Sequence, residues 1–217
     1  MTLDYLIIGA GPAGLQLAAL LEADGKHDYL VLEGSDAPGA FFATYPRHRQ
    51  LISINKPHTG TDDPELNLRL DWNSLLSDDP ALRFTSYTER YFPDADVMVQ
   101  YLADFAAKTG VKVRYNTRVT NVAKQQDGVF VVTAGDDSWQ ARAVIVATGV
   151  SKTVEPDIPG FELAEGYDVF PTDPRDYLDQ KVLILGKGNS AFETADALME
   201  TTRLIHLPGP SSVRMAW

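Results

Sequence analysis

The sequence predicts an α/β protein built around a parallel sheet, because a strand–turn–helix–strand pattern opens the chain and recurs near its end. Residues 3–8 are a short apolar run typical of a buried parallel strand, and a helix-like stretch follows over about residues 12–24. A second apolar run ends at Glu33. The pattern returns over residues 181–207, and two such units predict this fold far more specifically than one.

A glycine-rich turn with the spacing G-x-G-x-x-G joins the first strand to its helix. Gly9 permits the tight turn, Gly11 lets the backbone approach a pyrophosphate, and Gly14 lets the helix pack closely against the sheet. Pro12 and Ala13 stand between the later glycines, where the helix begins and offers free N–H groups to phosphate. The order of the parts favours a dinucleotide site over a turn that serves packing alone.

Glu33 ends the second apolar run, nineteen residues after Gly14. A carboxylate at this place can accept hydrogen bonds from both ribose hydroxyls of an adenine nucleotide. The same negative charge would repel a 2′-phosphate, so the first site suits FAD or NAD rather than NADP. We therefore expect a Rossmann-type domain around the first turn.

The second unit carries the related turn G-x-G-x-x-A, which begins 177 residues after Gly9. An apolar run precedes the turn and a helix-like stretch follows it to about residue 200. The candidate nucleotide contacts of this turn are Gly186, Gly188, Asn189 and Ser190. We expect a partial second Rossmann unit here.

The nucleotide expected at the second unit is NADP rather than NAD. The strand after its helix ends at Leu207 without an acidic residue, and Ser211, Ser212 and Arg214 follow. These side chains can receive a 2′-phosphate, which an acid would repel. The alternative for Arg214 is an ordinary solvated surface arginine.

Between the two units the sequence predicts a helix, a small antiparallel β-meander and a buried strand. The expected helix covers residues 94–108, and the expected strands cover residues 111–115, 118–123, 129–134 and 143–147. An Asp-Gly pair at 127–128 supplies a hairpin turn inside the meander. The meander and the parallel strands both belong to the expected first domain.

The last expected strand runs into Ala-Thr-Gly at residues 147–149. It matches the strand that leaves an FAD domain close to its cofactor, so Thr148 and Gly149 are candidate contacts. A proline-rich connector then covers residues 156–174. We expect an incomplete FAD-binding domain over residues 1–152, and the connector with the first half of an NAD(P)-binding domain over residues 153–217.

A basic loop follows the first predicted nucleotide unit. No acidic residue lies between Asp36 and Asp62, although Arg47, His48 and Arg49 do. One interpretation is a surface loop that happens to be basic. The interpretation favoured here is a loop that covers a diphosphate and a flat ring, because arginine is a forked donor and the loop follows a phosphate-binding unit.

Composition narrows the choice of partners and chemistry. A formal net charge of −11 with no basic tail argues against nucleic acid and anionic membrane surfaces as partners. The chain has no cysteine, which excludes disulfides, thiolate catalysis and cysteine-ligated metals within it, and its four scattered histidines show no metal-ligand spacing. No apolar run reaches membrane-spanning length, and the first strand begins too early for a signal peptide, so the expected location is cytoplasmic.

Several longer segments resemble one flavoprotein family. The chain is similar to the two-dinucleotide flavoproteins, which group the flavin-containing monooxygenases with the FAD/NAD(P) reductases. Within them it most resembles FAD-dependent oxidoreductase domain-containing protein 2 and its bacterial relatives. The segments that carry this resemblance are Phe41–Arg49, Leu51–Lys56, Asp71–Leu76 and Gly186–Thr194.

The resemblance implies an FAD- and NADPH-dependent oxidoreductase, with monooxygenase-like or general oxidoreductase activity on a small-molecule substrate. It places Arg49 near the FAD and the backbone of Val119 at the adenine. Asn55 stands where similar monooxygenases keep an asparagine beside the flavin, so a catalytic role for its amide is one expectation. The other is a structural role, because asparagine is common in turns.

The chain also departs from the family pattern. A monooxygenase fingerprint expects a histidine four residues after a connector glycine, but Phe170 stands there after Gly166, which argues against Baeyer–Villiger chemistry. The chain ends just after the second strand of the NADP unit, whereas full-length relatives continue. We therefore expect a truncated product or one piece of a split protein, with a complementing C-terminal polypeptide as a possible partner. The rival interpretations are a non-catalytic fragment that binds FAD weakly and a reductase without oxygenation.

Overall fold

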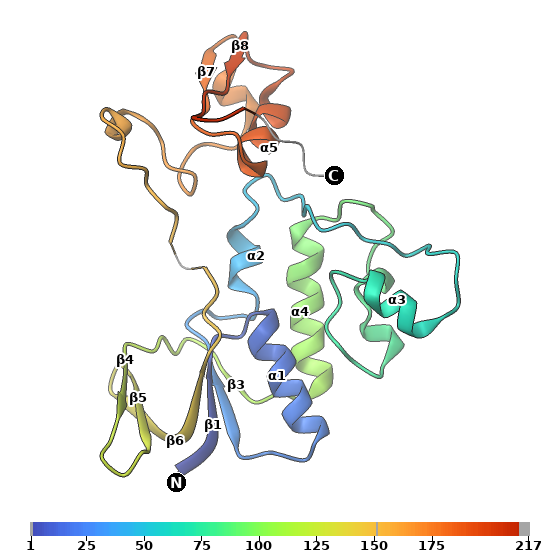
Figure 1. The fold of residues 1–217 in the computed structure, drawn as a ribbon, viewed down its shortest axis with the longest axis vertical. Coiled ribbons are helices and arrows are strands. Elements are labelled where there is room, and N and C mark those ends of the chain that lie inside the picture. The colour runs from blue at the N-terminus through green and yellow to red at the C-terminus, as the bar shows by residue number, and fades with distance from the viewer. Residues whose placement is uncertain (1, 151, 213–217) are drawn as a thin grey trace. The chain divides into compact units, whose positions relative to one another are not determined.

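The computed structural model describes residues 2–150 and 152–212 and divides them into two compact units. The first unit contains residues 2–45 and 50–150, and the second contains residues 46–49 and 152–212. A four-residue segment of the second unit is thus inserted in the sequence of the first. Figure 1 shows the elements of both units coloured along the chain.

A single six-stranded sheet forms the first unit, in the order β3-β2-β1-β6-β5-β4. The pairs β1–β2, β2–β3 and β1–β6 are parallel, whereas β4–β5 and β5–β6 are antiparallel. The predicted α/β class, with a parallel sheet and a small β-meander, is therefore confirmed. The strands are β1 (Thr2–Ile8), β2 (Tyr29–Leu32), β3 (Val113–Arg114), β4 (Asn121–Lys124), β5 (Phe130–Ala134) and β6 (Asp137–Val146).

Strand β6 joins the meander to the parallel strands and is longer than the sequence pattern predicted. Its residues 137–141 pair with β5, and its residues 140–146 pair with β1. The expected strand began only at Ala143, because the apolar run starts there while residues 137–142 are mostly polar. Hydrogen bonding to β5 extends the strand across this polar half.

Helices α1 (Pro12–Ala23) and α4 (Ala95–Thr109) pack together over one face of the sheet (Figure 1). Alternate strand residues such as Ile7 and Val31 face these helices, where Leu15 and Phe105 are fully buried. The intervening residues face the opposite side, where Leu6, Ile8 and Leu32 pack with Val132 and Ala141 of the meander. The period-2 alternation of β1 and β2 thus gives each face of the sheet its own apolar core.

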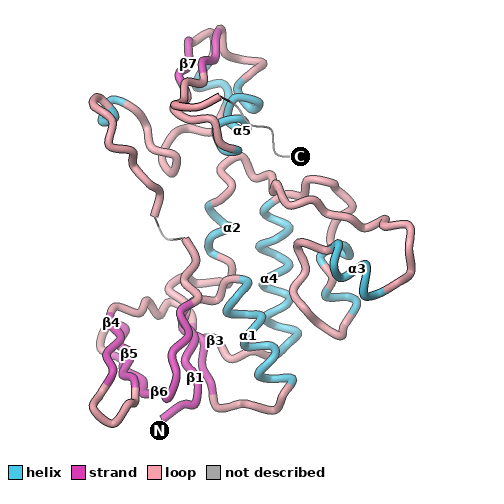
Figure 2. Tube along the Cα trace, viewed as in Figure 1, coloured by secondary structure: helices cyan, strands magenta, loops and turns pink. Residues whose placement is uncertain are grey.

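Most of residues 45–94 is loop, as Figure 2 shows. Two short helices were not predicted from the sequence: α2 (Ala40–Thr44), just before this region, and α3 (Pro64–Leu70), within it. The loop is fastened to α4 because the hydroxyl of Tyr101 accepts a 2.6 Å hydrogen bond from the N–H of Leu75. Two single 3₁₀ turns lie nearby, η1 (Pro80–Leu82) and η2 (Phe84–Ser86).

The second unit repeats the opening of the first. Strands β7 (Lys181–Leu183) and β8 (Leu204–His206) are parallel, and α5 (Asn189–Leu198) connects them. This arrangement confirms the predicted partial second Rossmann unit. The connector before it carries η3 (Phe161–Leu163) and η4 (Pro174–Tyr177). Over the described part of the chain, none of the helices combines the length and the apolar character that crossing a membrane requires.

Candidate dinucleotide-binding sites

The first glycine turn lies where the strand order of the sheet reverses. From β1 the chain crosses to β2 on one side, while β6 lies against the other side of β1. In open α/β sheets, the crevice beyond the carboxyl ends of such strands is where ligands bind. Gly9 follows β1 directly, and its main-chain N–H donates a 2.8 Å hydrogen bond to the carbonyl of Leu32 at the end of β2.

Two glycines of this turn are required by close backbone contacts. Gly9 has φ +107°, and a Cβ on it would lie 2.5 Å from the carbonyl oxygen of Ala147, just after β6. A Cβ on Gly14 would overlap the carbonyl oxygen of Gly9. Any larger residue would therefore push the start of α1 away from the sheet edge.

Gly11 differs from these two because a Cβ there would meet no described atom within 4 Å. Its backbone borders open space, as close approach of a diphosphate requires. Gly11 is also the N-cap of α1, where no side chain caps the helix, and Pro12 occupies the first turn. Ala13 is exposed at the same end. The N–H groups of the first turn thus have no intrahelical partner and can receive an anion.

Glu33 lies beside this turn, directly after β2. One carboxylate oxygen, Oε2, accepts a 2.7 Å hydrogen bond from the N–H of Ala10, and Oε1 accepts a 2.8 Å bond from the N–H of Ser35. The half-buried side chain is thereby held in one orientation. Each carboxylate oxygen keeps a further lone pair, so the group can still accept from ribose hydroxyls.

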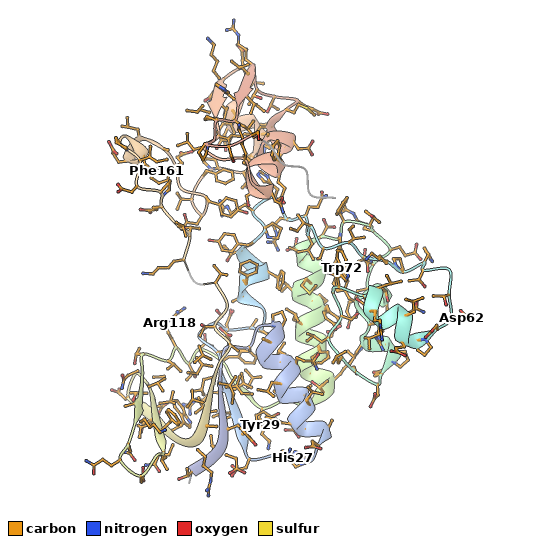
Figure 3. All side chains as sticks on the ribbon, in the orientation of Figure 1. His27, Tyr29, Asp62, Trp72, Arg118 and Phe161 are labelled. Atoms are coloured by element: carbon orange, nitrogen blue, oxygen red, sulfur yellow. The ribbon has the colours of Figure 1, made fainter. Side chains whose placement is uncertain are left out.

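Sequence reasoning missed Arg118, which lies at the same corner (Figure 3). The N–H of Thr117 donates a 2.7 Å hydrogen bond to the carbonyl of Glu33, and Asn116 adopts a positive φ of 51°. These features fold the loop back along the end of β2. The guanidinium carbon of Arg118 comes within 3.4 Å of the place where a Cβ on Gly34 would stand. The sequence signal that could have identified Arg118 is its position directly before Val119, the expected adenine contact.

The other candidate contacts of the first unit lie in loops at the strand ends. Val119 packs against the core on the meander face of the sheet. Thr148 brings its main-chain nitrogen within 3.3 Å of a Cβ built on Gly9, so the Ala-Thr-Gly segment passes beside the glycine turn. Gly149 follows with φ +61°. The roles of these residues toward a nucleotide stay predictions.

Asn55 is almost fully buried, with 1% of its surface exposed. Its Nδ2 donates a 2.6 Å hydrogen bond to the carbonyl of Thr88, and its main-chain N–H donates to the carbonyl of Tyr91. The Oδ1 atom is buried without a hydrogen-bond partner among the described residues. The observed contacts are structural, because they fasten two loop segments together, and the catalytic role of Asn55 stays a prediction.

The second glycine turn has the features of the first without its tight contacts. Gly186 has φ +128°, and its N–H donates a 3.0 Å hydrogen bond to the carbonyl of Pro208 beyond β8. Gly188 is the N-cap of α5 and no side chain caps the helix. Asn189 is exposed and Ser190 half-buried in the first helical turn. Arg214, expected at a 2′-phosphate, lies outside the described residues.

The basic loop does not present all its cations to a ligand. Within the second unit, Nη2 of Arg47 donates a 2.8 Å hydrogen bond to the carbonyl of Phe170, and Nε2 of His48 lies 3.1 Å from Oγ1 of Thr194. Burial, followed by the charge of Arg47, lowers the pKa of His48 below its usual value. Arg49 has φ +59° and packs with the same unit. The expected diphosphate role therefore does not describe Arg47 and His48, which bind protein groups.

Comparison with known proteins agrees with this geometry. FAD-dependent oxidoreductase domain-containing protein 2 of mouse is 50% identical over 99% of the chain, and that of zebrafish 46% identical over 99%. The chain spans 33% and 32% of the length of these two relatives.

Solved structures show the same fold at lower identity. The flavin-containing monooxygenase of Stenotrophomonas maltophilia matches with a TM-score of 0.72 and 24% identity, over 95% of this chain and 57% of its own. The bacillithiol disulfide reductase Bdr of Bacillus cereus matches with 0.71 and 24%, over 95% and 58%. OTEMO in complex with FAD and NADP matches with 0.68 and 22%, over 94% and 38%.

A sequence model of one family covers nearly the whole chain. The pyridine nucleotide-disulphide oxidoreductase family matches residues 6–215, a span that begins within β1 and includes both glycine turns. With two such turns at the carboxyl ends of parallel strands, the chain belongs to the pyridine nucleotide-disulphide oxidoreductase family, among the flavin-dependent oxidoreductases.

Proposed function

We propose that the chain binds FAD at the first glycine turn and NADPH at the second, as part of a monooxygenase-like oxidoreductase that acts on a small-molecule substrate. The observation that carries this proposal is the first turn itself. At Gly9 and Gly14 close backbone contacts leave no room for a side chain, and these glycines place the uncapped start of α1 where the strand order of the sheet reverses. Gly11 leaves open space for a diphosphate.

Different residues of the first unit are proposed to bind different parts of FAD. The N–H groups of Gly11, Ala13 and Gly14 at the start of α1 hold the diphosphate, and the carboxylate of Glu33 accepts from the ribose. Val119 offers its backbone to the adenine, and Arg118 lies at the same end of the sheet as Glu33. Thr148 and Gly149 run past the turn beside the cofactor.

The second unit is proposed to hold NADPH. Gly186, Gly188 and the N–H groups of Asn189 and Ser190 take its diphosphate at the uncapped start of α5. β8 ends at His206 and no acid follows before Pro208, so a 2′-phosphate meets no carboxylate from this strand end. OTEMO, which shares the fold, is a complex with FAD and NADP.

Bound FAD would supply the redox chemistry, by accepting a hydride from NADPH and delivering electrons to dioxygen or an organic acceptor. This chain contributes binding, orientation and exclusion of water, since it carries no cysteine for a dithiol relay. Monooxygenase-like chemistry further requires a dry environment at the flavin. The buried amide of Asn55 is the catalytic group proposed from this chain, as a hydrogen-bonding partner beside the flavin.

FAD binding is the direct test. Chain purified and reconstituted with FAD should be yellow with one FAD per chain, and anaerobic NADPH should bleach the flavin absorbance. NADH should act more weakly, because NADP is the expected second nucleotide. A colourless chain that takes up no FAD contradicts the proposal and favours a non-catalytic fragment.

The reaction with oxygen separates the monooxygenase from a reductase without oxygenation. After reduction by NADPH, mixing with oxygenated buffer should give a long-lived absorbance phase distinct from both oxidised and reduced flavin. Immediate reoxidation with one peroxide per flavin favours the reductase or oxidase. Because the relatives are about three times longer than this chain, we propose that the complete activity uses a complementing C-terminal polypeptide. The same measurement should therefore be repeated with that polypeptide added.

A further inference from the structure

The segment Pro46–Arg49 packs with the second unit although its neighbours in sequence on both sides belong to the first. We call these four residues the strap. The chain leaves the first unit at Tyr45 and re-enters it at Gln50. The strap therefore brings side chains encoded beside the first nucleotide unit into the second.

Arg47 anchors the strap to Phe170 of the connector. Its Nη2 donates a 2.8 Å hydrogen bond to the carbonyl of Phe170, and its guanidinium carbon lies 5.5 Å from the centre of that ring. A cation over an aromatic face is attracted by the ring quadrupole, and more strongly where water is excluded. The Nε atom of Arg47 is buried with no partner among the described residues, so the side chain is withdrawn from solvent.

His48 connects the strap to the start of α5. Its Nε2 lies 3.1 Å from Oγ1 of Thr194, and the Thr194 hydroxyl itself lies 2.8 Å from the carbonyl of Ser190. A hydroxyl has one proton, which it gives to that carbonyl, so His48 must donate from Nε2. A continuous relay thus runs from His48 through Thr194 to the first turn of α5.

Few side chains of helix α5 are buried against the rest of the second unit. Of its ten described residues, only Thr194 and Leu198 are buried. It connects the two strands of a two-stranded sheet, and a sheet of so few strands is marginally stable alone. A cavity of about 290 Å³ borders its Ser190, Thr194 and Leu198.

We propose that Arg47 and His48 are positioning residues for the second nucleotide site. They brace Phe170 and Thr194, and through Thr194 they fix the first turn of α5, whose N–H groups take the NADPH diphosphate. This inference rests on the proposed function for the identity of the ligand. It adds that the strap, which interrupts the first unit in sequence, sets the affinity of the second site.

The test compares five variants of the FAD-loaded chain by NADPH titration. H48A and T194V each remove one member of the relay and should weaken NADPH binding about 5- to 20-fold, and the double variant should be no weaker than either alone. H48Q keeps an N–H donor and should restore most of the affinity. H58A removes an exposed histidine of the same loop and should change nothing. FAD affinity should stay within about twofold throughout.

A second readout does not depend on NADPH. Hydrogen–deuterium exchange should quicken in residues 189–198 of H48A and stay unchanged in α1, with H48Q close to the wild type. Unchanged hydrogen–deuterium exchange in α5 of H48A would contradict the stabilisation of this helix by His48, whatever the NADPH affinity. Equal NADPH affinity in H48A and wild type overturns the positioning role. Wild-type chain that binds FAD but no NADPH overturns the proposed second site, and α5 exchange then still decides whether the strap braces the helix.

Discussion

The main-chain N–H of Ala10 donates a 2.7 Å hydrogen bond to Oε2 of Glu33, so the end of β2 is fastened to the glycine turn that follows β1. This contact joins the acid proposed to receive the ribose with the turn proposed to receive the diphosphate. Together with the hydrogen bond from the N–H of Gly9 to the carbonyl of Leu32, it fixes the distance between the two proposed subsites.

Replacing Glu33 should separate its two roles. E33A leaves the N–H groups of Ala10 and Ser35 without their acceptor and should lower the free energy of unfolding by about 1–3 kcal/mol. E33Q retains an acceptor and should lose less stability, yet its FAD affinity should fall about tenfold because charge-assisted bonds to the ribose are lost. Urea unfolding and FAD titration measure the two effects. Equal FAD affinity in wild type and both variants would contradict the ribose role.

Gly11 and Gly14 form a matched pair. G14A forces a Cβ against the carbonyl of Gly9 and should destabilise the chain by about 1–3 kcal/mol, as overpacking does. G11A adds a methyl group where no described atom lies within 4 Å, at a φ of −77° that alanine adopts readily. It should fold with wild-type stability and lose FAD binding at least tenfold. A G11A chain that binds FAD normally would show that the diphosphate does not approach this backbone.

Arg118 should contribute to the adenine end of the first site. R118A should weaken FAD binding about 3- to 10-fold, while R118K, which keeps the charge without the flat guanidinium, should recover only part of the loss. R142A removes another exposed arginine, one paired with Asp4 on the sheet, and serves as the control. Competition with ADP should weaken in parallel for R118A. Loss of FAD affinity without any change for ADP would place Arg118 elsewhere on the cofactor.

The stability of the chain should depend on pH through His48. Burial and the neighbouring charge of Arg47 lower its folded-state pKa, so below about pH 6.5 the unfolded state binds a proton that the folded state resists. The stabilisation is complete above that pH and is lost as pH falls toward the lowered pKa. The urea midpoint should therefore drop more from pH 7 to 5.5 in wild type than in H48Q. Parallel curves for the two proteins would refute this.

The opening unit could be predicted from sequence almost to its boundaries. The expected strand over residues 3–8 and helix over 12–24 correspond to Thr2–Ile8 and Pro12–Ala23. The signals there are local, since apolar runs, glycines and a helix-starting proline all act within one turn of the chain. Helix α3 was missed because its seven residues are too short for periodicity, although Asp63 before Pro64 is a usable start signal.

Other features could not be predicted from local sequence patterns. Strand β4 is exposed at all four residues, so no apolar alternation marks it, and the expected strand over residues 118–123 began too early. Arg118 instead turns toward Gly34, a residue far away in sequence. The contact of Arg47 with Phe170 joins residues 123 positions apart. The sequence of a basic loop does not show whether its cations bind a ligand or a carbonyl group of the protein.

The measurement that tests the central claim most directly is calorimetric titration of the chain with FAD, alongside G11A at matched stability. The account predicts one FAD per wild-type chain and at least tenfold weaker binding by G11A with an unchanged urea midpoint. Wild-type chain that remains folded and binds no FAD, or a G11A chain that binds it equally well, would contradict a diphosphate site at this turn.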